Sequence, residues 1–288
     1  MKRIAFLVLA LAVGFSFTAC TIQQAPNERP TNQPSNVQPT HTPSNSPEAA
    51  SKVVSVDDFL ISFEVLPPNN TGTVFAEFTF VNNSSSPIID FSIAALLKDS
   101  NKRTHYSTYF TVMPGETSPK FTSFGPATGD KADIEFLSFE YSVYNDDGTV
   151  THYEYDSKLQ QYKTWETTIR ASNSTININI NDFALTQEIE PPDSIGSVYL
   201  NMTYTNNTQY PIVGFSLAAL LKDSNEITYY SCYDTILPGE TSANFVSFGP
   251  LSQQMTDVEF MELSISIAES SGSDTYMYYN YKLGIWTR

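Results

Sequence analysis

Cysteine is almost absent from this 288-residue chain, which contains only Cys20 and Cys232. Two cysteines make no disulfide framework, so each folded part must be stable through the burial of its core alone. A duplicated segment, described below, carries Thr108 at the position that corresponds to Cys232. Because this thiol has neither a duplicate nor a partner, we expect Cys232 to be a small buried side chain in a strand.

Basic residues are also scarce. Lysine and arginine together number 15, against 31 aspartates and glutamates, and the formal net charge is −16. Binding to the phosphates of a nucleic acid requires a basic surface, so the composition excludes nucleic acid as a partner. It disfavours electrostatic adhesion to anionic lipids for the same reason. The acidity favours solubility.

Histidine occurs only three times, at His41, His105 and His152. The duplicate carries Tyr229 and Tyr276 at the positions of the last two, and the chain shows no Ser-His-Asp or metal-ligand spacing. A catalytic site needs a nucleophile, a base and a group that orients them. The sequence therefore predicts a protein that is not an enzyme and holds no cofactor.

Two acidic pairs keep one enzymatic alternative open: Asp133 with Glu135, and Asp257 with Glu259. Residues two apart on a strand point to the same face at about 7 Å, a separation that suits a glycosidase on distance alone. Any acidic β-protein contains such pairs, so a cell-wall hydrolase is the least favoured alternative.

Long hydrophobic runs are missing except at the start of the chain. Lys2 and Arg3 precede an apolar segment from Ile4 to Phe17, which is shorter than the ~20 residues that a membrane-spanning helix needs. Small residues follow it directly. This order is typical of a secretory signal peptide.

The end of this segment, Phe17-Thr18-Ala19-Cys20, resembles the lipobox of bacterial lipoproteins; Phe17 departs from the usual aliphatic residue. The resemblance implies a signal peptide at 1–19, cleavage before Cys20, and a diacylglyceryl group and palmitate on that cysteine. Two or more acyl chains suffice for stable anchoring. We therefore expect a lipid-anchored protein on the extracytoplasmic face of a bacterial cell membrane.

Residues 20–50 are nearly all Pro, Asn, Gln, Thr and Ser, without apolar periodicity. Such a segment cannot bury enough surface to offset its ordering entropy, so we expect a disordered tether.

Beyond residue 50 the sequence contains two copies of one segment. Phe91–Asn101 and Phe215–Asn225 are nearly identical, and the offset of 124 residues continues without a gap on both sides. The expected domains are 51–165 and 175–288, joined by a linker at 166–174.

Within each copy the apolar residues alternate. Val74, Ala76, Phe78 and Phe80 form one wholly apolar face of a predicted strand, and Ile176–Ile180 alternates in a similar way. The crowded run Ala94–Leu97 with its duplicate is predicted to be a central strand that is covered on both faces. Turns separate these runs: Pro114-Gly115 suits a type II turn, and Asp146-Asp147-Gly148 and Ser270-Ser271-Gly272 suit hairpin tips. Seven or eight strands per copy predict an all-β chain with two tandem immunoglobulin-like β-sandwich domains.

The order of these features also resembles a family of bacterial exported immunoglobulin-like domains, often called FxLYD-like. The matching features are Asn82-Asn83 at the end of a strand, Lys98–Asn101 after an apolar strand, and Pro114-Gly115-Glu116. They cover about half of each copy and are turn and core residues. The resemblance implies a cell-envelope lipoprotein with a sandwich fold, and it implies no catalytic residue.

Two kinds of ligand site are compatible with the sequence. Asp99 with Asn101, and Asp223 with Asn225, place oxygen atoms at alternate turn positions, as calcium prefers. Asp and Asn are favoured in turns regardless, so a purely structural role is preferred.

Tyrosines supply the second kind of site: Tyr153 and Tyr155 in one copy, and Tyr276 and Tyr278 in the other. Aromatic rows on an exposed sheet face can stack on sugars or form protein interfaces, although such residues also cover cores. We therefore expect a non-catalytic binding or spacing module that is anchored to the membrane by its lipid. Its partner would be an envelope protein or a glycan, with glycan binding through the tyrosine rows as the alternative.

Overall fold

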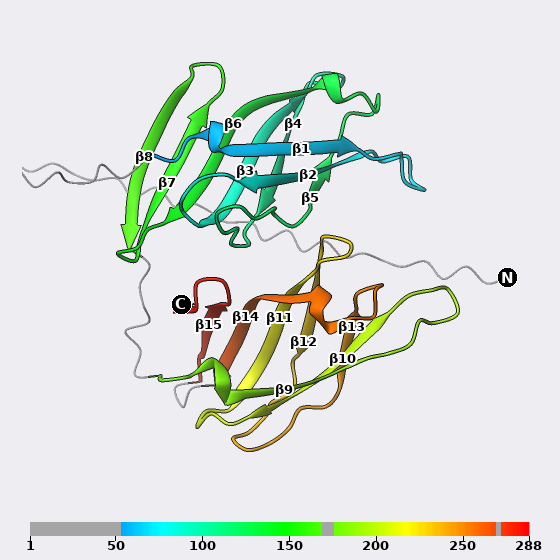
Figure 1. The fold of residues 1–288 in the computed structure, drawn as a ribbon, viewed down its shortest axis with the longest axis vertical. Coiled ribbons are helices and arrows are strands. Elements are labelled where there is room, and N and C mark those ends of the chain that lie inside the picture. The colour runs from blue at the N-terminus through cyan, green and yellow to red at the C-terminus, as the bar shows by residue number, and fades with distance from the viewer. Residues whose placement is uncertain (1–52, 169–175, 269–271, 288) are drawn as a thin grey trace, which may run out of the picture. The chain divides into compact units, whose positions relative to one another are not determined.

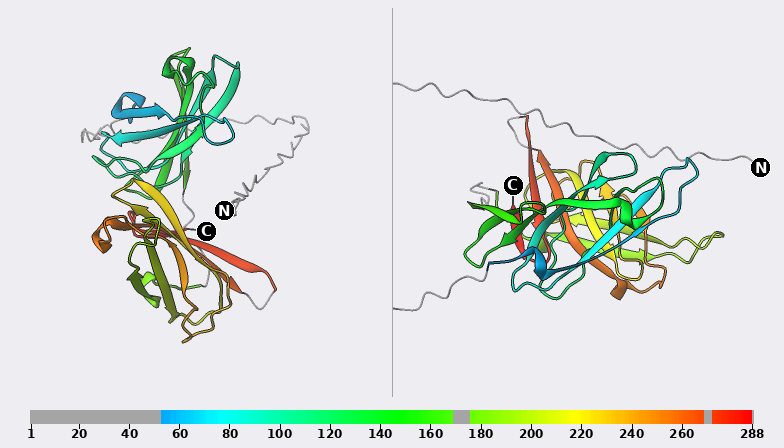
Figure 2. Two further views of the ribbon diagram at one scale, coloured as in Figure 1. Left: turned by 90° about the vertical axis from the view of Figure 1, so that its right-hand side faces the viewer. Right: turned by 90° about the horizontal axis from the view of Figure 1, so that it is seen from above.

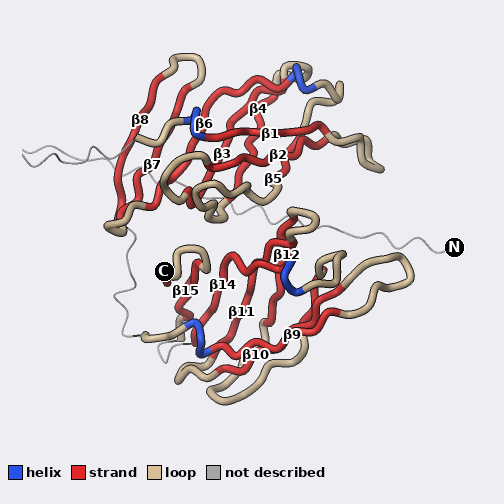
Figure 3. Tube along the Cα trace, viewed as in Figure 1, coloured by secondary structure: helices blue, strands red, loops and turns tan. Residues whose placement is uncertain are grey.

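The computed structural model describes residues 53–168, 176–268 and 272–287, and Ser51–Arg288 forms one compact unit. Its described residues contain no α-helix; the only helical elements are 3-10 turns of three residues each (Figure 3). The predicted signal peptide, the predicted lipidation site Cys20 and the predicted tether lie outside the described residues. The part that is described is an all-β chain of two tandem immunoglobulin-like sandwiches (Figure 1).

The first sandwich has eight strands in two antiparallel sheets. A three-stranded sheet has the order β1-β2-β5, and a five-stranded sheet has the order β4-β3-β6-β7-β8. The strands are β1 Phe59–Val65, β2 Phe75–Asn82, β3 Ile88–Leu97, β4 Lys102–Thr108, β5 Phe121–Phe124, β6 Ile134–Tyr144, β7 Thr149–Asp156 and β8 Gln161–Thr168, with 3-10 turns η1 Val56–Asp58 and η2 Lys131–Asp133.

The second sandwich repeats this arrangement with the orders β13-β10-β9 and β12-β11-β14-β15-β16. Figure 2 shows the ribbon from two further directions. Its strands are β9 Phe183–Ile189, β10 Tyr199–Asn206, β11 Ile212–Leu221, β12 Glu226–Cys232, β13 Phe245–Phe248, β14 Val258–Ala268, β15 Asp274–Asn280 and β16 Ile285–Thr287, with η3 Ile180–Asp182 and η4 Met255–Asp257.

The alternation of apolar residues along the strands explains which side chains form the core. The side chains of Ala76, Phe78 and Phe80 on β2, and of Val74 just before it, are all 5% exposed or less, as the period-two pattern predicts. The run Ala94–Leu97 lies in β3, which pairs with β4 on one side and with β6 on the other, so the prediction of a central strand is confirmed. Each sandwich has its own apolar cluster between its two sheets.

The turns also follow the sequence. Gly115 has φ +82°, as the second central residue of a type II turn requires, and Glu116 N donates to Met113 O at 3.0 Å. Gly148, with φ +81°, closes the hairpin between β6 and β7. Of the corresponding tip in the second sandwich only Gly272 is described, with φ +83°.

Two boundaries differ from those expected. Strand β8 continues to Thr168, which pairs with Thr149, so the first domain extends beyond residue 165. The segment Ile176–Ile180 is not a strand, although it alternates. The Asn179 side chain accepts a hydrogen bond from Asn181 N at 2.9 Å and so caps the turn η3; the first strand of this sandwich begins only at Phe183.

Candidate functional site

The structure separates the four tyrosines that the sequence grouped together. In the first sandwich Tyr153 is 8% exposed and its ring stacks on Tyr141, with centroids 4.9 Å apart. Tyr155 is half-buried against Tyr162 and Phe139. Burial raises the pKa of the Tyr153 hydroxyl. Both rings face the core, so the expected exposed row is absent from β7.

The register of the duplication explains this difference. The offset of 124 residues aligns Tyr153 with Met277, which is 2% exposed, whereas Tyr276 aligns with His152. Successive residues of a strand point to opposite faces. Tyr276 and Tyr278 therefore lie on the outer face of β15, and they are 56% and 38% exposed.

Two further tyrosines, which the sequence reading did not single out, join them on this face. Tyr229 on β12 is 57% exposed, and Tyr233, just beyond the end of that strand, is 79% exposed. We call Tyr229, Tyr233, Tyr276 and Tyr278 the tyrosine face. The sequence could have indicated Tyr229, because the duplication aligns it with His105, which lies on the outward side of β4.

Small residues lie between these rings. Across the sheet Gly214 on β11 pairs with Ser266 on β14, which pairs with Tyr276 on β15. In the next row Ser216 pairs with Ser264, and Ser264 with Tyr278. The small side chains leave a hollow of about 220 Å³, which we call the Gly214 pocket. Its lining consists of Val213, Gly214, Phe215, Ser216, Tyr233, Ser264, Ser266, Asp274 and Tyr276.

Carboxylates border the tyrosine face. Asp274 lines the Gly214 pocket, and Glu262 pairs with Ala218 opposite Tyr229. Burial raises the pKa of Glu262. Burial, and then the charge of Glu262, raise the pKa of Tyr229. The surroundings of this surface therefore disfavour a further negative charge.

The corresponding row of the first sandwich brings together three residues that the sequence did not connect. Asp90, Ser142 and His152 are neighbours across β3, β6 and β7. Ser142 Oγ lies 2.7 Å from His152 Nδ1, and His152 Nε2 lies 2.8 Å from Thr167 Oγ1. The Trp165 ring stacks on His152 with centroids 5.2 Å apart.

This row does not have the geometry of a nucleophilic triad. In such a triad the histidine lies between the serine and the acid, whereas here Ser142 lies between Asp90 and His152. Ser142 is also only 2% exposed, and its hydroxyl is already engaged with His152. Burial raises the pKa of Asp90, although the hydrogen bond from Ser142 and the charge of His152 oppose this shift.

The two acidic pairs do not form carboxylate pairs on strands. Asp133 and Asp257 lie in the turns η2 and η4, one residue before the following strand. Asp133 accepts a hydrogen bond from Thr128 Oγ1 at 2.6 Å, and Glu135 lies 3.4 Å from Lys158 Nζ. The carboxylates are thus engaged separately.

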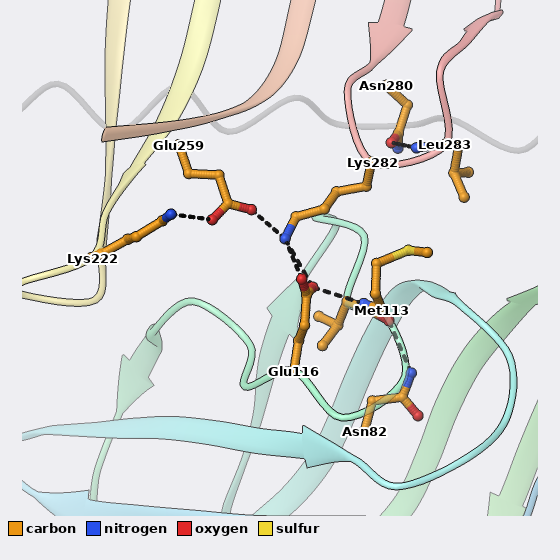
Figure 4. Close-up of polar contacts among 9 residues, drawn as sticks. Asn82, Met113, Glu116, Lys222, Glu259, Asn280, Lys282 and Leu283 are labelled. Carbon is orange, nitrogen blue, oxygen red and sulfur yellow. Dashed lines mark hydrogen bonds and ion pairs between the residues drawn. The ribbon is translucent and has the colours of Figure 1, made fainter. Parts of the chain in front are cut away.

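Glu259 lies in an ion cluster (Figure 4). It contacts Lys222 Nζ at 3.2 Å and also contacts Lys282 Nζ, which lies 2.8 Å from both carboxylate oxygens of Glu116. Burial opposes ionisation of Glu259, but the two lysines outweigh it and lower its pKa. A carboxylate that is ionised and paired in this way is not a general acid.

The aspartates of the two turns considered as calcium sites bond to the backbone of neighbouring loops instead. Asp99 Oδ2 accepts a hydrogen bond from Ala127 N at 2.6 Å, and Asp223 Oδ2 accepts one from Ser252 N at 2.9 Å. Asn101 and Asn225 have φ +55° and +57°, a conformation that asparagine tolerates. Within the described ranges no cluster of three or more His, Cys, Asp or Glu residues could hold a metal ion.

Comparisons with known proteins give no family. No family model matches the chain, and no curated protein matches it. Among solved structures, a match is the crystal structure of red sea bream transglutaminase, at 11% identity and a TM-score of 0.19. It covers 77% of this chain, and this chain spans 31% of that protein. None of the helices in the described part of the chain is long and apolar enough to cross a membrane.

Proposed function

We propose that this protein is an extracytoplasmic bacterial lipoprotein, anchored through Cys20, whose second sandwich binds a glycan without catalysis. The observation that carries the proposal is the tyrosine face. Four exposed tyrosines surround small side chains on one sheet surface, and such a surface can contact a flat sugar ring over its whole width. The anchor is supported by the resemblance of Phe17–Cys20 to a lipobox.

For the first sandwich we propose a spacing role. The positions that match Tyr276, Tyr278 and Ser264 carry His152, Glu154 and Glu140. Glu140 and Glu154 keep their hydration where the second sandwich has a small residue and a tyrosine. Tyr109, which is equivalent to Tyr233, and Trp165, which pairs with His152, are also exposed on this face, so the two copies differ in the row around the hollow and not in aromatic content as a whole. The first domain would then hold the binding domain away from the membrane.

Glycan binding is tested by calorimetric titration of Ser51–Arg288 with neutral tetrasaccharides, namely cellotetraose, chitotetraose and maltotetraose. The double variant Tyr276→Ala, Tyr278→Ala is expected to weaken binding by about tenfold or more, since about 1.4 kcal/mol of lost contact free energy corresponds to tenfold. The matched control is His152→Ala, Glu154→Ala, which changes the same positions of the first sandwich.

The control is expected to bind as the unchanged protein does. If the unchanged protein binds none of the three tetrasaccharides, the glycan proposal is overturned and the tyrosine face becomes a candidate interface for an envelope protein. Equal losses in the double variant and in its control would contradict the assignment to the second sandwich.

The anchor is tested separately in bacterial cells that express the full chain. Cys20→Ser is expected to move the protein from the membrane fraction to the soluble fraction, because no thiol remains to accept the lipid. Cys232→Ser is the control, since Cys232 is buried in β12 and should not affect fractionation. Membrane association of Cys20→Ser equal to that of the unchanged chain would refute lipid anchoring.

A further inference from the structure

Two equivalent serines of the two sandwiches have different surroundings. Ser142 lies between Asp90 and His152, and its hydroxyl oxygen is 2.7 Å from His152 Nδ1. Ser266 is 8% exposed, and its hydroxyl oxygen is buried without any hydrogen-bond partner. A buried hydroxyl that lacks a partner costs about 1–3 kcal/mol. A group that is retained at such a cost needs an explanation.

The missing partners are explained by two replacements. Gly214 stands where the first sandwich has Asp90, and Tyr276 stands where it has His152. Both changes remove a group that bonds the serine. The first also removes the side chain that would occupy the space, since a Cβ atom at Gly214 would lie 3.2 Å from Ser266 Cβ. The Gly214 pocket is therefore the place that an aspartate fills in the other copy.

We propose that the Gly214 pocket is the sugar-binding subsite of the tyrosine face, and that it takes one uncharged pyranose ring whose hydroxyl group bonds Ser266 Oγ. This inference rests on the proposed glycan-binding function and deepens it. Tyr233 and Tyr276 flank the pocket and supply the aromatic contacts to the ring. Ser264 and Ser216 also line the pocket, and Ser216 Oγ is already 2.9 Å from Ser231 Oγ.

The size of the pocket fits a single ring. Its volume of about 220 Å³ lies below the roughly 300–1,000 Å³ that is typical of sites for drug-sized ligands. Two hollows of similar size, about 240 and 250 Å³, occur elsewhere in the described residues. None of the unpartnered buried side-chain atoms found in the described residues lines either of them. The orphaned Ser266 hydroxyl therefore distinguishes the Gly214 pocket.

The negative charges near the pocket favour an uncharged ligand. Asp274 lines the pocket, Glu262 lies on the same sheet face, and the whole chain carries a net charge of −16. An anionic sugar would meet repulsion both at the pocket and at long range. We therefore expect tetragalacturonate, which has the same length but is charged, to bind more weakly than the best of the three neutral tetrasaccharides.

The test uses Ser51–Arg288 and two substitutions inside the pocket. Ser266→Ala is expected to weaken binding of the best neutral tetrasaccharide by about tenfold, while the midpoint of thermal unfolding stays the same or rises because an unpartnered hydroxyl is removed. Gly214→Asp, which copies the first sandwich, is expected to abolish measurable binding. The matched controls are Ser142→Ala and Asp90→Gly, and both should bind as the unchanged protein does.

The outcomes separate this inference from the proposed function. If Ser266→Ala and Gly214→Asp bind normally while Tyr276→Ala, Tyr278→Ala does not, the subsite is overturned and the tyrosine face stands. Tighter binding of tetragalacturonate than of any neutral probe would overturn the choice of a neutral ring. If Gly214→Asp fails to fold, as judged by circular dichroism, Ser266→Ala alone decides. A fall in both stability and affinity for Ser266→Ala would show a structural serine and overturn the inference.

Discussion

The outer faces of the two five-stranded sheets have the same strand order and register but carry different side chains. In the first sandwich the row of Asp90, Ser142 and His152 is linked across β3, β6 and β7. In the second, Gly214, Ser266 and Tyr276 leave a hollow with an unpartnered hydroxyl. The sheet order and the register are the same in both copies. The comparison teaches that a few outward replacements can open a hollow in a row of side chains that is filled and hydrogen-bonded in the other copy.

Some inward positions carry the same residue in both copies. Phe91 and Phe215, which are equivalent, are each 1% exposed at the centre of their cores, and Tyr106 and Tyr230 each donate their hydroxyl to a backbone carbonyl 18 residues further along the chain. Other inward positions do change: Ala76, Phe80 and Tyr153 are matched by Leu200, Tyr204 and Met277, and all six residues are buried. A core tolerates such exchanges when the apolar residues around them repack. The outward replacements named above differ in kind, since they exchange an aspartate for a glycine and a histidine for a tyrosine.

The largest expected effect concerns a feature that both copies keep. Asn82 is fully buried; its amide donates to Ser86 O and Val112 O, and its carbonyl accepts from Ser84. Asn206 makes the equivalent bonds in the second sandwich. We expect Asn82→Ala and Asn206→Ala each to destabilise their own sandwich by at least about 2 kcal/mol, because several buried groups lose their partner.

Calorimetric unfolding of Ser51–Arg288 measures this effect. Asn83→Ala, at the exposed neighbouring position, is the control and should change the free energy of unfolding little. A loss in one copy but not in the other would break the comparison, since it would show that the two frames are not equivalent in energy.

A smaller effect is expected inside the cores. Tyr204 is fully buried and its hydroxyl has no partner, whereas the equivalent residue of the first sandwich is Phe80. We expect Tyr204→Phe to stabilise the second sandwich by about 1 kcal/mol, because the cost of the unpartnered hydroxyl disappears. The reciprocal change Phe80→Tyr should destabilise the first sandwich. Chemical denaturation of both variants would contradict the argument if Tyr204→Phe lowered the stability.

Most of the fold could be predicted from the sequence, because its signals are local or repeated. The alternation around Phe78, the glycine of the turn at Gly115 and the match of Phe91 with Phe215 fix strands, turns and duplication. The error at Ile176–Ile180 has a physical cause. An alternating apolar pattern reports which side chains face a core, but it does not report whether the backbone has a partner strand.

The candidate site could be predicted only in part. The tyrosines were visible, but Tyr153 and Tyr276 were grouped by residue type although the duplication places them on opposite faces. Applying the offset to single residues would have separated them. The Gly214 pocket could not be found in this way, since it depends on three strands that bring Gly214, Ser266 and Tyr276 side by side.

The smallest expected effect is the pH dependence of stability that Asp90, the residue equivalent to Gly214, gives the first sandwich. Burial raises the pKa of Asp90 above the ordinary value of 3.8, so the folded first sandwich holds this proton more tightly than the unfolded chain does. The stability that Asp90 contributes is then fully present below pH 3.8 and is lost as the pH rises through the folded pKa. Asp90→Asn, which cannot ionise, lacks this loss.

We therefore expect the unfolding midpoint of Asp90→Asn to rise relative to the unchanged protein between pH 3 and pH 7. Thermal unfolding at several pH values measures the difference, and Gly214→Asn serves as the comparison in the second sandwich, where no carboxylate is replaced and no such trend should appear. A difference that stays constant with pH, or that reverses, would contradict a raised pKa for Asp90.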